Sequence, residues 1–309
     1  MQIVLILNPR SGRGGAKDAA QRLCQELKHR DHQVTMLEMQ AEPTTIESAI
    51  DDADRVVVLG GDGTVHHLLP ILAKTQTPMY HMGFGTANLI AKTFNMLMDT
   101  SNVADALEAD HTPMAIDLPT CNGHPFLIMV SMGIDASVIH RFEDSRKLKG
   151  GYRTYLKPIL RELLSPRPAH FVVETNTHSD TQASTTGILV VANLRSYGGG
   201  FDPCPDADPS DSKLNAVTIP CTTTLGAAFN YALLRLRRSA RTMKRMASGS
   251  FTISPSSPCP VFVQIDGEKA TSIPWLEDGV LCSGEQLHIV VGDQSINVHA
   301  TIVPGPRQI

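Results

Sequence analysis

The chain has 309 residues, 42% hydrophobic and 19% charged, with a formal net charge of −4. This length suits one large domain or two medium ones, and the slightly acidic balance argues against a general nucleic-acid-binding protein. Six scattered cysteines without a CxxC pair indicate reduced thiols in a cytoplasmic protein and exclude a disulfide framework. No stretch reaches the roughly 18 apolar residues of a membrane-spanning helix, so any membrane contact is expected to be peripheral.

The first part of the chain alternates predicted strands and helices. Apolar runs predict strands at 3–7, 33–39, 55–60 and 78–84, and the segments between them predict helices at about 16–30, 44–53, after residue 64, and from 86 to 94. Strands separated by helices predict a Rossmann-like parallel sheet covered on both faces, within an α/β domain of residues 1–115. Ligands of such sheets bind at the carboxyl ends of the strands.

Strands dominate from about residue 116 onward. They are predicted at 126–132, 170–175, 186–194, 215–220, 251–254, 261–267 and 286–291, interrupted by a helical insertion near 152–164 and a basic helix near 225–247. This pattern predicts a mostly antiparallel β-sandwich over residues 116–309. A return of the C-terminal tail to the first domain is left open.

Two glycine turns stand where a predicted strand meets a predicted helix. They are "GGDGT" (60–64) and "GFGTANLIA" (83–91), and backbone N–H groups at a helix start favour a phosphate. Neither is a Walker A loop, and each taken alone could be an ordinary turn, with Thr86 capping its helix. Together, on neighbouring parallel strands, they would face one crevice. Asp62 inside the first turn would repel a phosphate unless a cation stood between them.

Several motifs in a fixed order resemble the catalytic domain of diacylglycerol kinases and their bacterial lipid-kinase and sphingosine-kinase relatives. They are "NPRSG" (8–12), "GGDGT", "GTAN" (85–88), "GIDA" (133–136), "YLKPILRELL" (155–164), "VANLRSYGGGFDPCPDADPSDSKL" (191–214) and "VQIDGE" (263–268). The resemblance implies an enzyme that transfers the γ-phosphoryl group of ATP to the hydroxyl of a lipid such as diacylglycerol. It also implies a site in the cleft between the two domains.

The resemblance assigns nucleotide-binding roles within the first domain. Residues expected to cradle the ATP phosphates are Gly60, Gly61, Asp62, Gly63 and Thr64, joined by Thr86 and Asn88, while Asn8 and Gly12 would shape the neighbouring loop. Mg²⁺ resolves the repulsion at Asp62, because it binds one or two carboxylates together with phosphate oxygens.

A phosphoryl-transfer site also needs a carboxylate to orient or deprotonate the attacking hydroxyl. In "DGE" the resemblance makes Glu268 the general base and Asp266 a helper toward Mg²⁺ or phosphate, with Asp62 as a competing base. If the segment is extended, Asp266 and Glu268 point to the same face. The alternative is a surface hairpin turn, since Asp-Gly commonly forms one.

A second, structural Mg²⁺ is implied at Asp208, Asp211 and the main-chain carbonyl of Lys213. The alternative is a solvated acidic loop. Two departures from the family pattern bear on the metal sites: Leu89 stands where an Asp is frequent, and Ser212 replaces a glycine.

The predicted basic helix carries six cations between Arg235 and Arg245. Such a helix can lie on an anionic bilayer, or its apolar stripe can pack on the sandwich and leave the cations solvated. The expected partner is a lipid substrate at a membrane surface, with no nucleic acid. The oligomeric state is open, a homodimer included. Two other functions remain alternatives: an NAD-kinase-like enzyme acting on a non-lipid hydroxyl, and a non-catalytic lipid- or nucleotide-binding homologue.

Overall fold

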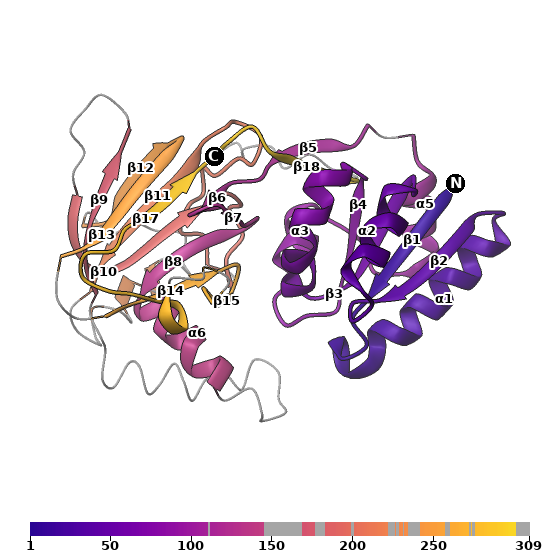
Figure 1. The fold of residues 1–309 in the computed structure, drawn as a ribbon, viewed down its shortest axis with the longest axis horizontal. Helices are drawn as coiled ribbons and strands as arrows, with labels where there is room; N and C mark the ends of the chain where they lie inside the picture. Colours follow the sequence, from indigo (N-terminus) through magenta and orange to yellow (C-terminus); the bar gives the residue numbers. More distant parts are fainter. Residues whose placement is uncertain are drawn as a thin grey trace. The chain divides into compact units, whose positions relative to one another are not determined.

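The computed structural model divides the chain into two compact units, which are described separately (Figure 1). The first contains Met1–Leu118 and the segment from Asp293 onward, and the second contains Pro119–Gly292. The structure describes residues 1–110, 112–144, 169–176, 183–198, 201–221, 226, 229–230, 232–233, 242–256, 260–271, 273 and 276–300.

The first unit is built on a six-stranded sheet. In sheet order its strands are β2 (Gln33–Glu38), β1 (Gln2–Leu7), β3 (Arg55–Gly60), β4 (Met79–Gly83), β18 (Ser295–Val298) and β5 (Met114–Asp117). Strands β1 to β4 are parallel to their neighbours, and β18 runs parallel to β4 and antiparallel to β5. The predicted Rossmann-like parallel sheet is therefore confirmed.

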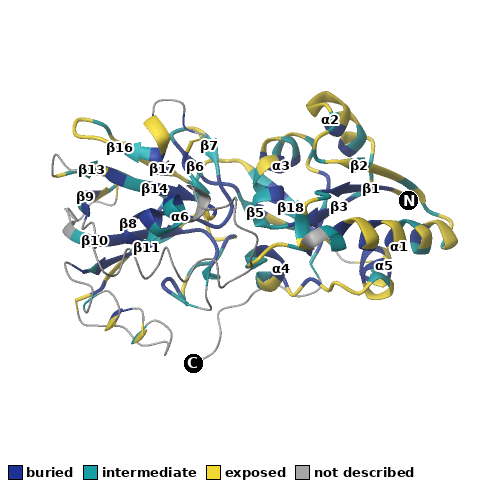
Figure 2. Ribbon diagram, turned by 90° about the horizontal axis from the view of Figure 1, so that it is seen from below, coloured by how far each residue is buried: buried dark blue, intermediate teal, exposed yellow. Residues whose placement is uncertain are grey.

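Helices cover both faces of this sheet, as Figure 2 shows. On one face α1 (Gly15–His29) packs with α5 (Thr100–Glu108), and on the other α2 (Pro43–Asp51) packs with α3 (Asp62–Thr75). The short 3-10 helix η1 (Ser11–Gly14) precedes α1, and α4 (Leu89–Thr93) follows β4. Central strands β1, β3 and β4 are buried almost throughout, which explains why their sequences are continuous apolar runs.

The second unit contains, among the described residues, one twelve-stranded sheet whose pairings are all antiparallel. Its strands are β6 (Thr120–Cys121), β7 (His124–Pro125), β8 (Met129–Gly133), β9 (Ala169–Thr175), β10 (Ala183–Ala192), β11 (Leu214–Pro220), β12 (Lys244–Ser248), β13 (Ser250–Pro255), β14 (Val261–Ile265), β15 (Glu268–Lys269), β16 (Val280–Leu281) and β17 (Leu287–Val290). Helix α6 (Ile134–Asp144) follows β8, and the 3-10 helix η3 (Glu277–Gly279) precedes β16. The predicted mostly antiparallel β domain is confirmed, and its strands form one curled sheet.

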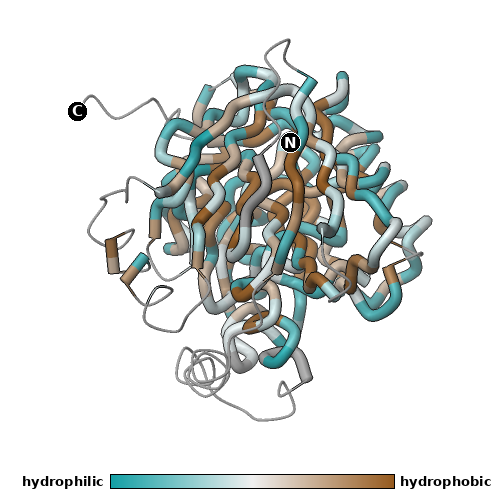
Figure 3. The backbone as a smooth tube through the Cα atoms, turned by 90° about the vertical axis from the view of Figure 1, so that its left-hand side faces the viewer, coloured by the Kyte–Doolittle hydropathy of each residue, from teal (hydrophilic) through white to brown (hydrophobic). Residues whose placement is uncertain are grey.

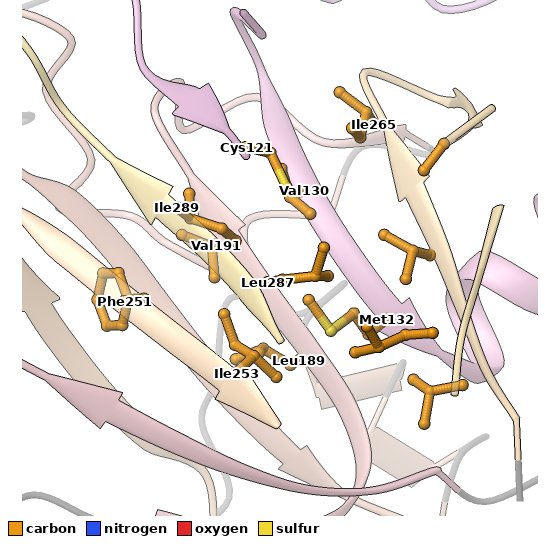
Figure 4. Close-up of a cluster of buried hydrophobic side chains, with 14 of the residues drawn as sticks. Cys121, Val130, Met132, Leu189, Val191, Phe251, Ile253, Ile265, Leu287 and Ile289 are labelled. Carbon is orange, nitrogen blue, oxygen red and sulfur yellow. The ribbon is translucent and has the colours of Figure 1, made fainter. Parts of the chain in front are cut away.

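The sheet curls where the neighbouring strand hydrogen-bonded to β10 changes. The first half of β10 pairs with β9 and its second half with β8, and the change falls at Gly187, whose φ is 143°. The curled sheet encloses an apolar core. Hydrophobic residues concentrate on the strands, while the loops are more hydrophilic (Figure 3). The labelled side chains in Figure 4 come from β6, β8, β10, β13, β14 and β17, among them Cys121, Met132, Leu189, Val191, Phe251, Ile253, Leu287 and Ile289.

The basic helix predicted near 225–247 is wrong at its C-terminal end. Residues Lys244–Ser248 form β12, which pairs with β11, and the ladder outweighs the local helical pattern. The described residues between 226 and 233 are helical. Most of the cationic stretch, and the helix predicted at 152–164, lie outside the described residues. No helix in the described part of the chain is both long and apolar enough to cross a membrane.

Candidate active site

Three loops of the first unit meet at the carboxyl ends of β1, β3 and β4. The loop after β1 is joined to β3, because Asn8 N donates to the Leu59 carbonyl at 3.0 Å. The loop after β4 is joined to the first glycine turn, because Phe84 N donates to the Gly60 carbonyl at 2.6 Å. The two glycine turns thus share one edge of the sheet, as the parallel order requires.

Asn8 connects the first loop with α3. Its Nδ2 donates to Thr64 Oγ1 at 3.4 Å, and its Oδ1 accepts from Arg10 N at 3.1 Å. Gly12 adopts φ +60°, and a Cβ there would lie 3.1 Å from the Phe84 ring. Both residues therefore shape the loop, and the role in nucleotide binding that the resemblance implies for them stays a prediction.

The two glycine turns touch backbone to backbone. A Cβ on Gly85 would lie 2.6 Å from Gly61 Cα, closer than any real contact. Asn88 fixes the second turn, since its Oδ1 accepts from Gly85 N at 2.6 Å and its Nδ2 donates to the Gly83 carbonyl at 2.9 Å. The predicted capping by Thr86 is wrong, because Thr86 is exposed and α4 begins at Leu89 with Asn88 as the preceding residue.

This contact gives a stability prediction for Gly85→Ala. The added methyl group must displace backbone, so we expect a loss of about 1–3 kcal/mol in the free energy of unfolding, measured by denaturant titration. Gly15→Ala is the matched control: Gly15 has φ −60° at the start of α1 and open surroundings, with its closest neighbour atom at 3.9 Å. That variant should be as stable as the parent or more stable. Equal stabilities for the two variants would contradict the assigned contact.

Asp62 is the first residue of α3 and is half-buried. Its Oδ1 accepts from Ile90 N at 3.1 Å, which links it to the helix after the second glycine turn. Among the described residues, no donor is hydrogen-bonded to its other carboxylate oxygen. An oxygen ligand beside amide-lined turns has the chemistry that Mg²⁺ prefers. No group of three or more His, Cys, Asp or Glu within the described residues is placed to hold a metal ion by itself.

His81 lies behind the first glycine turn and was not predicted from the sequence. The side chain is fully buried, and Nε2 donates to the Gly60 carbonyl at 3.0 Å. Burial lowers the pKa of His81, opposed by the negative charge of Asp62. The ring is therefore neutral, with its proton on the nitrogen that faces Gly60.

Lowering the pH should therefore destabilise the first unit. The folded state keeps His81 neutral, while the unfolded chain takes up a proton near the ordinary pKa of 6.5. The contribution of His81 to the free energy of unfolding is fully present above that pKa. It is lost as the pH drops below the pKa, by up to about 1.4 kcal/mol per pH unit for one proton. Urea titrations of the parent and of His81→Gln between pH 7 and 5 should give a shallower decline for the variant. Identical declines would show that another group is responsible.

In the second unit, "DGE" forms a hairpin turn between β14 and β15. Ile265 pairs with Glu268, and the two turn residues, Asp266 and Gly267, have φ of 52° and 86°. The segment thus adopts the hairpin turn that was the alternative, and Asp266 and Glu268 do not share one face of an extended strand. Positive φ at both central residues is typical of the type I′ turn that Asp-Gly favours.

The side chain of Asp266 has a structural role in the hairpin. The residue is 6% exposed, and its carboxylate accepts three backbone hydrogen bonds, from Leu127 N at 2.9 Å, Ile128 N at 2.7 Å and Met129 N at 3.0 Å. These bonds anchor the hairpin to the two residues before β8 and to the first residue of β8. Glu268, half-buried at the start of β15, is carried on this anchored turn.

In the acidic loop before β11, the carboxylates accept hydrogen bonds from groups of the same loop. Asp208 Oδ1 accepts from Ser210 N at 3.0 Å and from Ser210 Oγ at 2.6 Å, and Asp211 Oδ1 accepts from Lys213 N at 3.0 Å. Ser212 adopts φ +55°, where the family pattern has glycine. A structural Mg²⁺ at Asp208, Asp211 and Lys213 stays a prediction.

Two family models match consecutive parts of the chain. Residues 2–121 match the diacylglycerol kinase catalytic domain, and residues 128–291 match the YegS C-terminal NAD kinase beta sandwich-like domain. A diacylglycerol kinase from Mycobacterium tuberculosis is 31% identical over 223 residues, covering 69% of this chain and 72% of that protein. The crystal structure of a diacylglycerol kinase from Bacillus anthracis is similar with a TM-score of 0.67 at 16% identity, covering 97% of each chain.

Proposed function

Because the chain belongs to the diacylglycerol kinase family, we propose that it transfers the γ-phosphoryl group of ATP to a hydroxyl group of a lipid such as diacylglycerol. The observation that carries this proposal is the backbone contact between the two glycine turns, with Asp62 hydrogen-bonded across them to Ile90. Amide groups of adjacent turns can bind a polyphosphate. The carboxylate at their junction can hold the cation that accompanies it.

Asp62 would be the protein ligand of Mg²⁺. When bound, the ion would supply positive charge that offsets the negative charge of the phosphates. Asn8, Asn88 and His81 act on the turns themselves, because each holds a backbone or side-chain group of the glycine loops in place. The first unit thus supplies the binding and orientation of the nucleotide.

Glu268 would accept the proton of the attacking lipid hydroxyl, so that the oxygen can attack the γ-phosphorus as the bond to ADP breaks. It is carried on a turn that two groups of hydrogen bonds immobilise. Asp266 is an anchor of that turn in this proposal, since three backbone donors already occupy its carboxylate. The lipid is expected at a membrane surface, reached by peripheral contact from the cytoplasm.

Incubation with γ-labelled ATP, Mg²⁺ and a panel of acceptors tests the proposal. The panel contains dioleoylglycerol, phosphatidylglycerol, a sphingoid base, an isoprenoid alcohol and NAD. Transfer of label to one of the lipids is the expected result. Label on NAD alone would support the NAD-kinase-like alternative, and metal-dependent ATP binding with no transfer to any acceptor would support a non-catalytic homologue.

A further inference from the structure

A chain of hydrogen-bonded polar side chains, two of them buried and Asp135 half-buried, lies behind the hairpin that carries Glu268. Gln264 of β14 and Ser131 of β8 are opposite one another in the sheet register and are 2% and 0% exposed. Asp135, at the start of α6, completes the chain. None of these residues belongs to the nucleotide loops, which lie in the first unit.

In this row of hydrogen-bonded groups, the Gly267 N–H at one end and the Asp135 carboxylate at the other determine which atom of each pair is the donor. A backbone N–H can only donate, so Gly267 N faces Gln264 Oε1, at 2.7 Å. The side-chain amide then presents Nε2, which donates to Ser131 Oγ at 2.7 Å. The hydroxyl of Ser131 in turn donates to the Asp135 carboxylate.

Asp135 terminates the chain as an acceptor. Tyr197 and Gln264 also hydrogen-bond to its carboxylate, together with Ser131. Burial raises the pKa of Asp135, and these hydrogen bonds oppose the change. A cluster that satisfies each of its buried polar groups rigidifies its surroundings, whereas one missing partner leaves a costly unpaired group.

The chain reaches the turn at a second point, separate from Asp266. Asp266 ties one turn residue to the segment before β8, and Gln264 ties the other, Gly267, to the sheet interior. Gly267 lies outside the β14–β15 ladder, whose last pair is Ile265 with Glu268. Among the described residues, the side chain that holds this turn residue next to Glu268 is that of Gln264.

We propose that Gln264, supported by Ser131 and Asp135, is a positioning residue that fixes the orientation of Glu268 for phosphoryl transfer. The inference rests on the proposed function, because it assigns Glu268 to the attacking hydroxyl. Losing the tie at Gly267 lets the hairpin tip move, and a displacement of about 1 Å at a reacting group can lower a rate about 100-fold.

Gln264→Met tests this role with little change in side-chain volume. Turnover of ATP and Mg²⁺ with the lipid that the parent labels, in detergent micelles, should show kcat lowered about 10- to 100-fold. The KM for ATP should stay within about twofold of the parent value, because the substitution does not touch the nucleotide loops. Ser131→Ala, which removes the support but leaves Gln264 in place, should lower kcat by a smaller factor. If Gln264→Met does not fold, the kcat of Ser131→Ala still tests the positioning role.

Val263→Ala is the matched control. Val263 is the fully buried neighbour of Gln264 on β14 and contributes to the apolar core, so its truncation destabilises the unit without touching the turn. Its kcat should remain at the parent value at temperatures where it is folded. Amide hydrogen exchange gives a readout independent of activity: Gly267 N–H should be protected in the parent and exchange faster in Gln264→Met.

The outcomes separate the inference from the function on which it rests. A parent protein that labels no lipid of the panel would refute the proposed function. An active parent with an equally active Gln264→Met variant would refute the positioning role. So would an equal loss of kcat in Val263→Ala, a parallel rise in the KM for ATP, or unchanged exchange at Gly267.

Discussion

Glu268→Gln is expected to lower kcat for lipid phosphorylation about 100- to 10,000-fold, the range of a lost general base. The amide has nearly the same shape as the carboxylate but does not accept the hydroxyl proton. The thermal unfolding temperature should change little, since Glu268 is half-buried on a turn that Asp266 and Gln264 hold. The assay uses labelled ATP and the lipid accepted by the parent protein.

The variant should still bind ATP with Mg²⁺ as tightly as the parent, because the nucleotide loops are intact. This distinguishes a base from a metal ligand. Glu277→Gln, which neutralises an exposed carboxylate of the same unit, serves as the control and should keep the parent kcat. If Glu268→Gln retains full turnover, the base lies elsewhere and Asp62 is the remaining candidate.

The sequence predicted the part of the site that is local along the chain. Apolar runs end in "GGDGT" and "GFGTAN", and a parallel sheet must bring such ends to one edge. The contact between Gly61 and Gly85 follows from that arrangement. The family pattern also singled out Asn88, whose role in phosphate binding stays a prediction; in the structure its side chain hydrogen-bonds to Gly83 and Gly85 and holds the turn.

The sequence did not predict contacts between residues far apart in the chain. The three backbone donors to Asp266 lie more than 130 residues before it, so no spacing in "DGE" could reveal that its aspartate is an anchor. The Asp-Gly pair was consistent with both an extended segment and a turn. His81 is one apolar-strand residue among several, and its contact with Gly60 depends on the pairing of β3 with β4. Residues 244–247 were predicted as helix because their pairing with β11 cannot be read locally.

The structure also changes what to expect from substitutions at Asp62. Asp62→Ala removes the acceptor of the Ile90 N–H as well as the charge, so a loss of binding in that variant would mix two causes. Asp62→Asn keeps a side-chain oxygen at the same place and removes only the charge. The free energy of unfolding of Asp62→Asn should stay within about 1 kcal/mol of the parent value.

Asp62→Asn is expected to change ATP affinity in opposite directions with and without Mg²⁺. With Mg²⁺ present, loss of a carboxylate ligand should raise the Kd for ATP about 100-fold. Removing a group that only hydrogen-bonds to a metal ligand typically weakens metal binding about 10- to 100-fold, and a direct ligand should matter no less. With EDTA in place of Mg²⁺, the same change removes a negative charge facing the polyphosphate and should lower the Kd, because like charges repel. Isothermal titration of both proteins under both conditions measures this reversal, and Asp52→Asn, an exposed carboxylate of the same unit, should show neither effect. Weaker binding under both conditions would mean that Asp62 only shapes the turn, and that the cation is held by other groups.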